Sequence, residues 1–160
     1  MSSLRRTLQL LSIMVIASVP TFAFAQATSY GPPIGIDDAK KIAAATVAEA
    51  KKNNWNMAIA IMDNSGFLVY YEKMDDTQSG SVQVAIDKAK TAAMFRRPTR
   101  VFEEGVAKGR VALLGLTGAT PITGGVPIMK GGKVIGGIGV SGATGDQDEQ
   151  CAKAGADTVK

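Results

Sequence analysis

The sequence predicts an α+β fold in which helices pack on an antiparallel sheet. Apolar, β-branched runs occur in pairs joined by short turns, and helical patterns stand before and after each pair. A parallel sheet would instead alternate single strands with helices. A second observation is the segment 123–142, which holds eight of the chain's 18 glycines among valines and isoleucines. This composition predicts two adjacent strands, one face of which carries few side chains because of the glycines.

The elements can be predicted in chain order from periodicity and from residues that begin or end them. Asp37 and Asp38 suit the positive end of a first helix, and Pro98 ends a second one. The predicted elements are a helix at 36–53, strands at 57–62 and 67–74, helices at 81–97 and 100–108, a strand at 111–116, strands at 126–129 and 134–141, and a last helix that begins near Thr144.

Two turns join the strand pairs. Residues 63–66 (Asp-Asn-Ser-Gly) are typical of a turn, because Asp and Asn bond to nearby backbone and Gly accepts positive φ. Gly131-Gly132 lies between Lys130 and Lys133 and suits a two-residue hairpin loop for the same reason. The sequence therefore predicts two β-hairpins.

The first 25 residues are typical of a secretory signal peptide. Arg5 and Arg6 precede an apolar segment at 8–19, and Ala23-Phe24-Ala25 fits the small-x-small cleavage rule. The apolar segment is shorter than the ~20 residues that span a membrane. We expect a signal peptide at 1–25, a flexible lead at 26–33, a single domain at 34–160, and a periplasmic or secreted protein with no stable membrane span after cleavage.

The composition excludes several classes of function. The chain has no histidine, which removes Ser-His-Asp and Cys-His mechanisms and the commonest metal and haem ligand. Its formal net charge of +4 includes Arg5 and Arg6, so cleavage leaves +2, and no basic stripe indicates nucleic-acid binding. Cys151 is the single cysteine and forms no internal disulfide. We expect it to be buried, with a cross-link between two chains as the alternative.

The glycines of segment 123–142 have two interpretations. They can let a helix or a second subunit approach the sheet, or they can leave a groove in which the amides of Gly124 and Gly125 face an anion or a flat ring. The spacing Gly137-Ile-Gly139-Val-Ser-Gly142 matches GxGxxG. A dinucleotide site is excluded, because the chain ends 18 residues later without the second strand and acidic residue.

Three polar side chains also have two interpretations each, and a fourth has one. Arg96 and Arg97 are either helix-dipole partners or a clamp for carboxylates, which guanidinium groups bind in a bidentate manner. Thr99 is either the N-cap of a short helix or a hydroxyl that faces the groove. Lys88 lies within a helical pattern and is interpreted as a solvated side chain.

With these residues in view, the chain resembles the GlcG/HbpS-like haem-binding family, which includes the C-terminal domain of PduO-type proteins. The resemblance covers about 34–155, and it rests on the order of several short stretches rather than on any one of them. These are Ile36-Asp-Asp-Ala-Lys-Lys-Ile42, Ile61-Met-Asp-Asn-Ser-Gly66, Glu72-Lys-Met-Asp75, Ile86-Asp-Lys-Ala89, Thr91-Ala-Ala-Met-Phe95, Pro98-Thr99, Gly124-Gly-Val-Pro-Ile128, Gly136-Gly-Ile-Gly-Val-Ser-Gly142 and Gln147-Asp-Glu149.

The resemblance implies a profilin-like, three-layer α/β/α fold with an antiparallel sheet of about five strands, and it implies homo-oligomers. It also implies haem or a related tetrapyrrole as the ligand, with haem degradation in some members and a place beside glycolate or diol metabolism for others. Thr99 falls on the Pro-Thr step that borders the family's haem groove and is carried over as an iron contact. The histidine of other members is absent, so the iron would meet a hydroxyl, Met, Tyr or Lys, or be held weakly.

Two functions therefore compete. In the first, an exported protein binds haem against the glycine-rich face, with Arg96 or Arg97 on the propionates and Thr99 toward the iron, and weak ligation allows slow peroxide-dependent degradation. In the second, the same arginines and the amides of Gly124 and Gly125 bind a small carboxylate. A third alternative, in which the glycine face is only a subunit interface, gives no ligand.

Overall fold

The computed structural model describes residues 28–160, so the predicted signal peptide lies outside the described residues. The regular elements are α1 (Ile36–Lys52), β1 (Ala58–Asp63), β2 (Leu68–Lys73), α2 (Ser81–Phe95), α3 (Arg100–Ala107), the 3-10 helix η1 (Val111–Gly115), β3 (Gly125–Lys130), β4 (Lys133–Ser141), α4 (Gly145–Ala156) and the 3-10 helix η2 (Asp157–Val159). Among these residues no helix is both long enough and apolar enough to cross a membrane.

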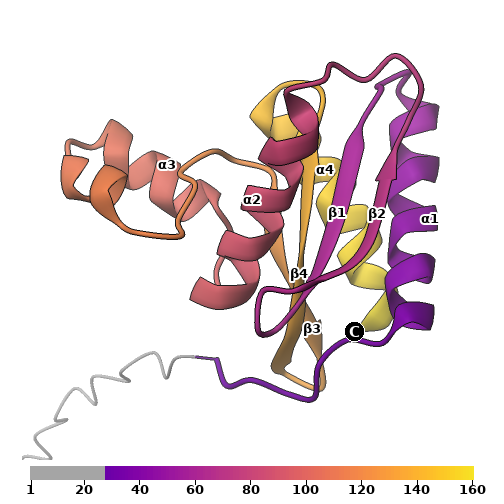
Figure 1. Ribbon diagram of the computed structural model, residues 1–160, viewed down its shortest axis with the longest axis horizontal. Coiled ribbons are helices and arrows are strands. Elements are labelled where there is room, and N and C mark those ends of the chain that lie inside the picture. Colours follow the sequence, from indigo (N-terminus) through magenta and orange to yellow (C-terminus); the bar gives the residue numbers. More distant parts are fainter. Residues whose placement is uncertain (1–27) are drawn as a thin grey trace, which may run out of the picture.

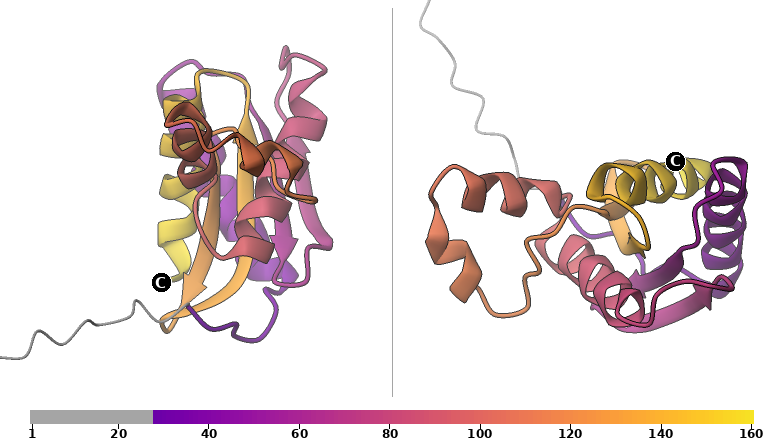
Figure 2. Two further views of the ribbon diagram at one scale, coloured as in Figure 1. Left: turned by 90° about the vertical axis from the view of Figure 1, so that its left-hand side faces the viewer. Right: turned by 90° about the horizontal axis from the view of Figure 1, so that it is seen from above.

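The sheet is antiparallel throughout and has the strand order β2-β1-β4-β3. Strand β1 pairs with β4 so that Ile59 lies opposite Val140 and Ile61 opposite Ile138. Helices α1 and α4 cover one face of the sheet and α2 covers the other, whereas α3 and η1 extend away from it (Figures 1 and 2). The predicted three-layer α+β architecture is confirmed, with four strands in the described chain.

The strand predicted at 111–116 is wrong, because residues 111–115 form the 3-10 helix η1 and a turn follows at 117–118. Gly109 has a positive φ of 88° and reverses the chain after α3, and no sheet strand lies beside the segment. An apolar run becomes a strand only where a neighbour pairs with its backbone. The other elements lie within a few residues of their predicted positions.

The two faces of the sheet are packed differently. The face under α1 and α4 holds the larger core, which includes Ile59, Ile61 and Ile138. On the opposite face, alanines of α2 pack against glycines of the strands. A Cβ atom on Gly137 would lie 2.4 Å from the carbonyl oxygen of Ala89, and one on Gly139 would lie 2.1 Å from that of Ala85. The glycines therefore admit the helix backbone itself.

The lead predicted to be flexible is instead attached to the domain over residues 28–33. Gly31 donates its amide to Val134 on β4, and the amide of Val134 donates to Ser29, both at 2.9 Å. The hydroxyl of Tyr30 donates to the carbonyl of Met94 at the end of α2 at 2.7 Å. These contacts could not be predicted from the sequence, because a short polar segment has no periodicity that indicates its partners.

Cys151 lies on the buried face of α4 and is part of the core, as expected for a lone cysteine. Burial raises the pKa of its thiol to about 12. The thiol therefore stays protonated at neutral pH and is a poor nucleophile, which removes the cross-linking alternative for the native fold.

The close contact between α2 and β4 can be tested with one methyl group. We expect Gly139→Ala to lower the free energy of unfolding by about 3 kcal/mol or more, because its Cβ would overlap helix backbone that has no room to move. Gly80→Ala is the control, since no atom lies within 4 Å of its Cβ position and its φ is −62°. Urea unfolding of both variants measures the difference, and equal stabilities would contradict the packing.

Candidate functional site

Thr99 lies at the start of α3, but its hydroxyl does not cap the helix. The side chain is fully buried. The amide of Gly125 donates to its Oγ1 at 2.9 Å, and the amide of Thr99 donates to the carbonyl of Gly125 at 3.0 Å. This reciprocal pair fixes the segment before α3 to the beginning of β3. Its predicted contact with iron stays a prediction, and it would require the hydroxyl to leave Gly125.

Gly124 and Gly125 are buried beneath the protein's own atoms. A Cβ atom on Gly124 would lie 2.7 Å from Nζ of Lys88, and one on Gly125 would lie 2.5 Å from the carbonyl oxygen of Lys88. The amide of Gly125 is already bound by Thr99. Of the two interpretations of the glycines, the structure therefore favours close helix packing over an open groove.

Arg96 and Arg97 lie together after α2 but point to different partners. Arg96 adopts a left-handed conformation with φ 55°, donates to the carbonyl of Thr28 at 2.9 Å, and lies 5.0 Å from the ring centre of Tyr30. It is thus engaged by the N-terminal segment. Arg97 is exposed, with its guanidinium 5.9 Å from the ring centre of Phe102. Of the two arginines, Arg97 is the more accessible to a ligand.

Lys88 is not the solvated side chain that the sequence suggests. Only 1% of it is exposed, and its Nζ donates to Asp148 Oδ2 at 2.7 Å and to the carbonyl of Val140 at 3.0 Å. Burial raises the pKa of Asp148, whereas the ammonium group and the amides of Ala143 and Gly142 act in the opposite direction. The pair joins α2, β4 and α4 at one buried point.

The residues around Lys88 could have indicated that it is buried. Its neighbours on the helix are small and apolar, namely Ala85, Ala89 and Ala92. A lysine on such a face is expected to be buried with it. Its partner is 60 residues away in the chain, so no local motif reveals it.

A second charged cluster fixes α3 to α4. Arg100 bridges the exposed Asp146 and the buried Glu149, and Lys153 reaches Glu149 at 2.7 Å. Burial would raise the pKa of Glu149, but its bonds with Lys153 and Arg100 outweigh burial and lower it. Nearby, Glu103 accepts the amide of Thr123 at 2.7 Å. These contacts hold the root of α3 against the domain.

A groove of about 390 Å³ lies along β3, which is an edge strand of the sheet. Its walls are mainly apolar and its lysines are more than half exposed. Pro98 adjoins Thr99, so the groove borders the predicted site. The lining residues are Pro98, Val126, Pro127, Met129, Lys153, Ala156, Asp157 and Lys160.

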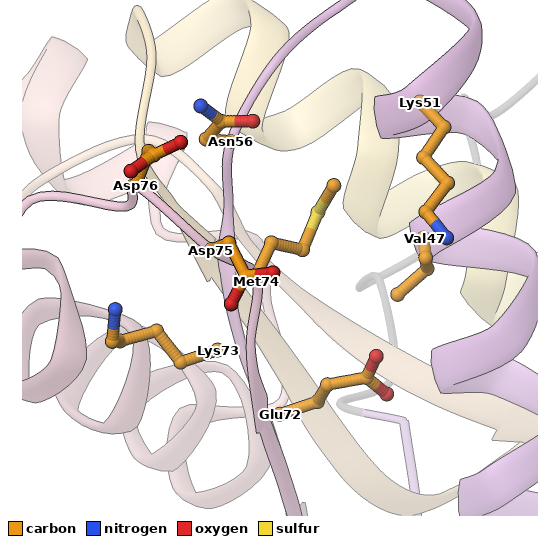
Figure 3. Close-up of a pocket in the computed structure, with 8 residues that line it drawn as sticks. All are labelled: Val47, Lys51, Asn56, Glu72, Lys73, Met74, Asp75 and Asp76. Carbon is orange, nitrogen blue, oxygen red and sulfur yellow. The ribbon is translucent and has the colours of Figure 1, made fainter.

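A second hollow, of about 430 Å³, lies between α1 and the end of β2. Figure 3 shows Lys51 of α1 across from Glu72 and Met74, with Lys73 directed to the other side of the strand. Apart from Val47 and Met74, its lining side chains are polar or charged and of both signs. This hollow suits a small polar molecule and not a large apolar ring. Within residues 28–160 no group of three His, Cys, Asp or Glu side chains is placed to hold a metal ion.

Comparisons with known proteins agree with the fold. The family model described as "Haem degrading protein HbpS-like" matches residues 34–157. Protein GlcG of Escherichia coli strain K12 is 45% identical over 103 residues, which are 64% of this chain and 77% of GlcG.

The chain is also similar to solved structures of HbpS and PduOC. A double mutant of HbpS from Streptomyces reticuli is 30% identical, with a TM-score of 0.75 over 90% of this chain and 99% of that one. The structure described as a PduOC:Heme complex is 23% identical, with a TM-score of 0.72 over 80% and 96% of the two chains. Because the identity to PduOC is only 23%, this similarity supports the fold alone.

The lowered pKa of Glu149 predicts an acid-sensitive contribution to stability. A carboxylate whose pKa is lower in the folded state stabilises the fold above its ordinary pKa of about 4.3 and loses that contribution as the pH falls further. We expect the wild-type free energy of unfolding to fall below about pH 4.3, and Glu149→Gln to fall less steeply. Unfolding curves across this range measure the slopes. Parallel curves would contradict the role of the carboxylate.

Proposed function

The chain belongs to the HbpS-like family, and we propose that it binds haem or a related tetrapyrrole in the groove along the edge of β3. The observation that supports this proposal is a mainly apolar groove with two exposed lysines beside Pro98 and Thr99. Ligand pockets of this kind, with volumes of about 300–1,000 Å³ and a few polar groups, suit a flat apolar ring.

The groove replaces the glycine face as the proposed position of the ring. Helix α2 covers Gly137 and Gly139, and Lys88 covers Gly124 and Gly125, so a ring has no access to that backbone. The groove keeps the ligand beside the Pro98-Thr99 step, which by resemblance borders the family's haem groove. It lies at a sheet edge and needs no rearrangement of the core.

Met129 is the residue that we propose faces the iron. A thioether is a known axial ligand of haem, and the side chain of Met129 lines the groove. Thr99 is the second candidate, because its hydroxyl lies one residue from Pro98, but it must first release the amide of Gly125. The proposal needs no histidine.

Three cationic side chains are proposed to bind the propionates. Lys153 and Lys160 line the groove, and each forms an ion pair with a carboxylate at 2.7 Å while remaining more than half exposed. Arg97 directly precedes Pro98 and is exposed. The pair of Lys160 with Asp157 is exposed on both sides and contributes little, so Lys160 can exchange its partner for a propionate at small cost. If Lys153 did the same, the buried Glu149 would keep Arg100 as its partner.

Bound haem would supply a redox-active iron, and slow peroxide-dependent haem degradation is the finer part of the proposal. Its support is the family's description as haem-degrading proteins, together with a groove that opens at the sheet edge to water and peroxide. The alternative is a small carboxylate held by the same lysines in the same groove.

We also propose that the protein is exported, on the basis of the features of residues 1–25. Expression of the full chain in a bacterium with a periplasm should yield a periplasmic protein whose N-terminal sequence begins at Gln26. A cytoplasmic product that retains Met1 would contradict export without affecting the proposal for haem.

The haem proposal can be tested by titrating haemin into the purified protein. We expect a saturable Soret band for the wild type. Met129→Leu should shift this band and weaken binding roughly tenfold, as expected for one lost interaction of about 1.4 kcal/mol. Met74→Leu is the matched control, because Met74 lines the hollow between α1 and β2 instead. Its spectrum should be that of the wild type.

The same titration separates the alternatives. A shift of the band in Met74→Leu, with Met129→Leu unchanged, would place the ligand in the hollow beside α1 and overturn the groove. If haemin gives no saturable band, a thermal-shift screen of small carboxylates tests the second function, because a bound ligand raises the unfolding temperature. Loss of that shift in Lys153→Ala would support carboxylate binding in the groove.

A further inference from the structure

The hollow of about 430 Å³ between the last turn of α1 and the end of β2 takes no part in the proposed haem site. No residue that lines it also lines the groove along β3. Its volume lies within the range of about 300–1,000 Å³ that is typical of sites for small molecules. The hollow is therefore a candidate site for a second ligand, independent of haem.

Side chains of opposite charge face each other across this hollow. Lys51 lines it from the last turn of α1, and Glu72 lines it from the end of β2 (Figure 3). Within residues 28–160 neither of them forms an ion pair. Lys73 does not compete for Glu72, because its side chain points to the other side of the strand, where Nζ lies 3.5 Å from the carbonyl oxygen of Thr77. The space between the ammonium group and the carboxylate is thus open to a ligand.

The carboxylate of Glu72 is held in position by a neighbour on the same strand. The hydroxyl of Tyr70 donates to its Oε2 at 3.0 Å. This hydrogen bond raises the pKa of Tyr70, so the phenol stays protonated and keeps donating at neutral pH. The other carboxylate oxygen, Oε1, is left for a cationic group. Asp75 and Asp76, directly after β2, add two further carboxylates to the lining.

Two lining side chains of the hollow are apolar. They are Val47 and Met74, and both pack against the larger core of the domain. The main chain at Met74 is fixed, because its amide donates to the carbonyl of Met57 at 3.0 Å and its carbonyl accepts the hydroxyl of Thr77 at 2.8 Å. A short carbon chain can contact these two side chains while its polar ends reach the charged walls.

From this arrangement we propose that the hollow binds a small zwitterion, a molecule that carries an ammonium group and a carboxylate on a short carbon chain. Its carboxylate pairs with Lys51 at the end of α1, and its ammonium group pairs with Glu72 beside Tyr70. Charge-assisted hydrogen bonds of this kind are about twice as strong as those between neutral groups. Val47 and Met74 contact the carbon chain.

The mixed charge of the lining favours a zwitterion over a ligand of one sign. A dicarboxylate would place a second negative group among Glu72, Asp75 and Asp76, and a diamine would place a second positive group beside Lys51. Both contacts are repulsive and cost affinity. A metal ion is a poorer match too, since in the described part of the chain these carboxylates form no group of three that could hold one. A zwitterion pairs with both walls of the hollow.

Titration of the purified protein with amino acids, followed by nitrogen-15 correlated NMR, tests the proposal. The probes are glycine, β-alanine and γ-aminobutyrate, in which a carbon chain of increasing length separates the two charges. We expect at least one probe to cause saturable shifts of the amide signals of Lys51, Glu72 and Met74. Propionate and propylamine, which carry one charge each, should cause no saturable shifts there. Absence of saturable shifts with all three amino acids, or equal binding of propionate, would overturn the proposal.

Two variants and a control identify the charged partners. Lys51→Met and Glu72→Gln should each weaken binding of the tightest probe roughly tenfold, with amide spectra that otherwise show the wild-type fold. Lys52→Met is the matched control, because this neighbouring lysine is 75% exposed, pairs with Glu49 on its own helix and does not line the hollow. Its affinity should be that of the wild type. Unchanged affinity in Lys51→Met or in Glu72→Gln, or an equal loss in Lys52→Met, would overturn the proposal.

Discussion

The buried contact between Lys88 and Asp148 is the interaction on which the rest of the structure depends. It draws α2 onto the glycines of β3 and β4 and holds the beginning of α4 at the same point. An ion pair with 1% and 3% of its side chains exposed is stable only when both partners are present, since loss of one leaves an uncompensated charge that costs about 3–5 kcal/mol. The glycines of β3 and β4 thus admit α2, and the groove proposed for a ligand lies at the sheet edge instead.

Much of the fold could be predicted from local patterns. The hairpin at Gly131-Gly132 has the positive φ values of 55° and 74° that two glycines favour, and Thr144 and Gln147 form the capping box that begins α4. Local patterns failed where the outcome depends on distant partners. The apolar run at 111–116 lacks a neighbouring strand, and Lys88 meets a carboxylate 60 residues away. The tethered N-terminal segment depends in the same way on β4 and α2.

Only the approximate position of the candidate site could be predicted from the sequence. The Pro98-Thr99 step borders the proposed groove, but the groove is assembled from residues near 98, 126–129 and 153–160, which no motif connects. Thr99 and Gly125 are hydrogen-bonded to each other, and Gly124 and Gly125 pack closely against Lys88 of α2. Without histidine, a thioether and exposed lysines are the groups that the groove offers to a tetrapyrrole. Iron held in this way would be ligated weakly.

The central claim is that a flat ring lies along the edge of β3 and not on the glycine face. Haemin is paramagnetic and broadens the amide signals of nearby residues in a nitrogen-15 correlated NMR spectrum. We expect substoichiometric haemin to broaden the signals of Val126, Met129, Lys153 and Ala156, while those of Lys51 and Glu72 remain sharp. Broadening centred on Lys51 and Glu72, or no localised broadening at all, would contradict it.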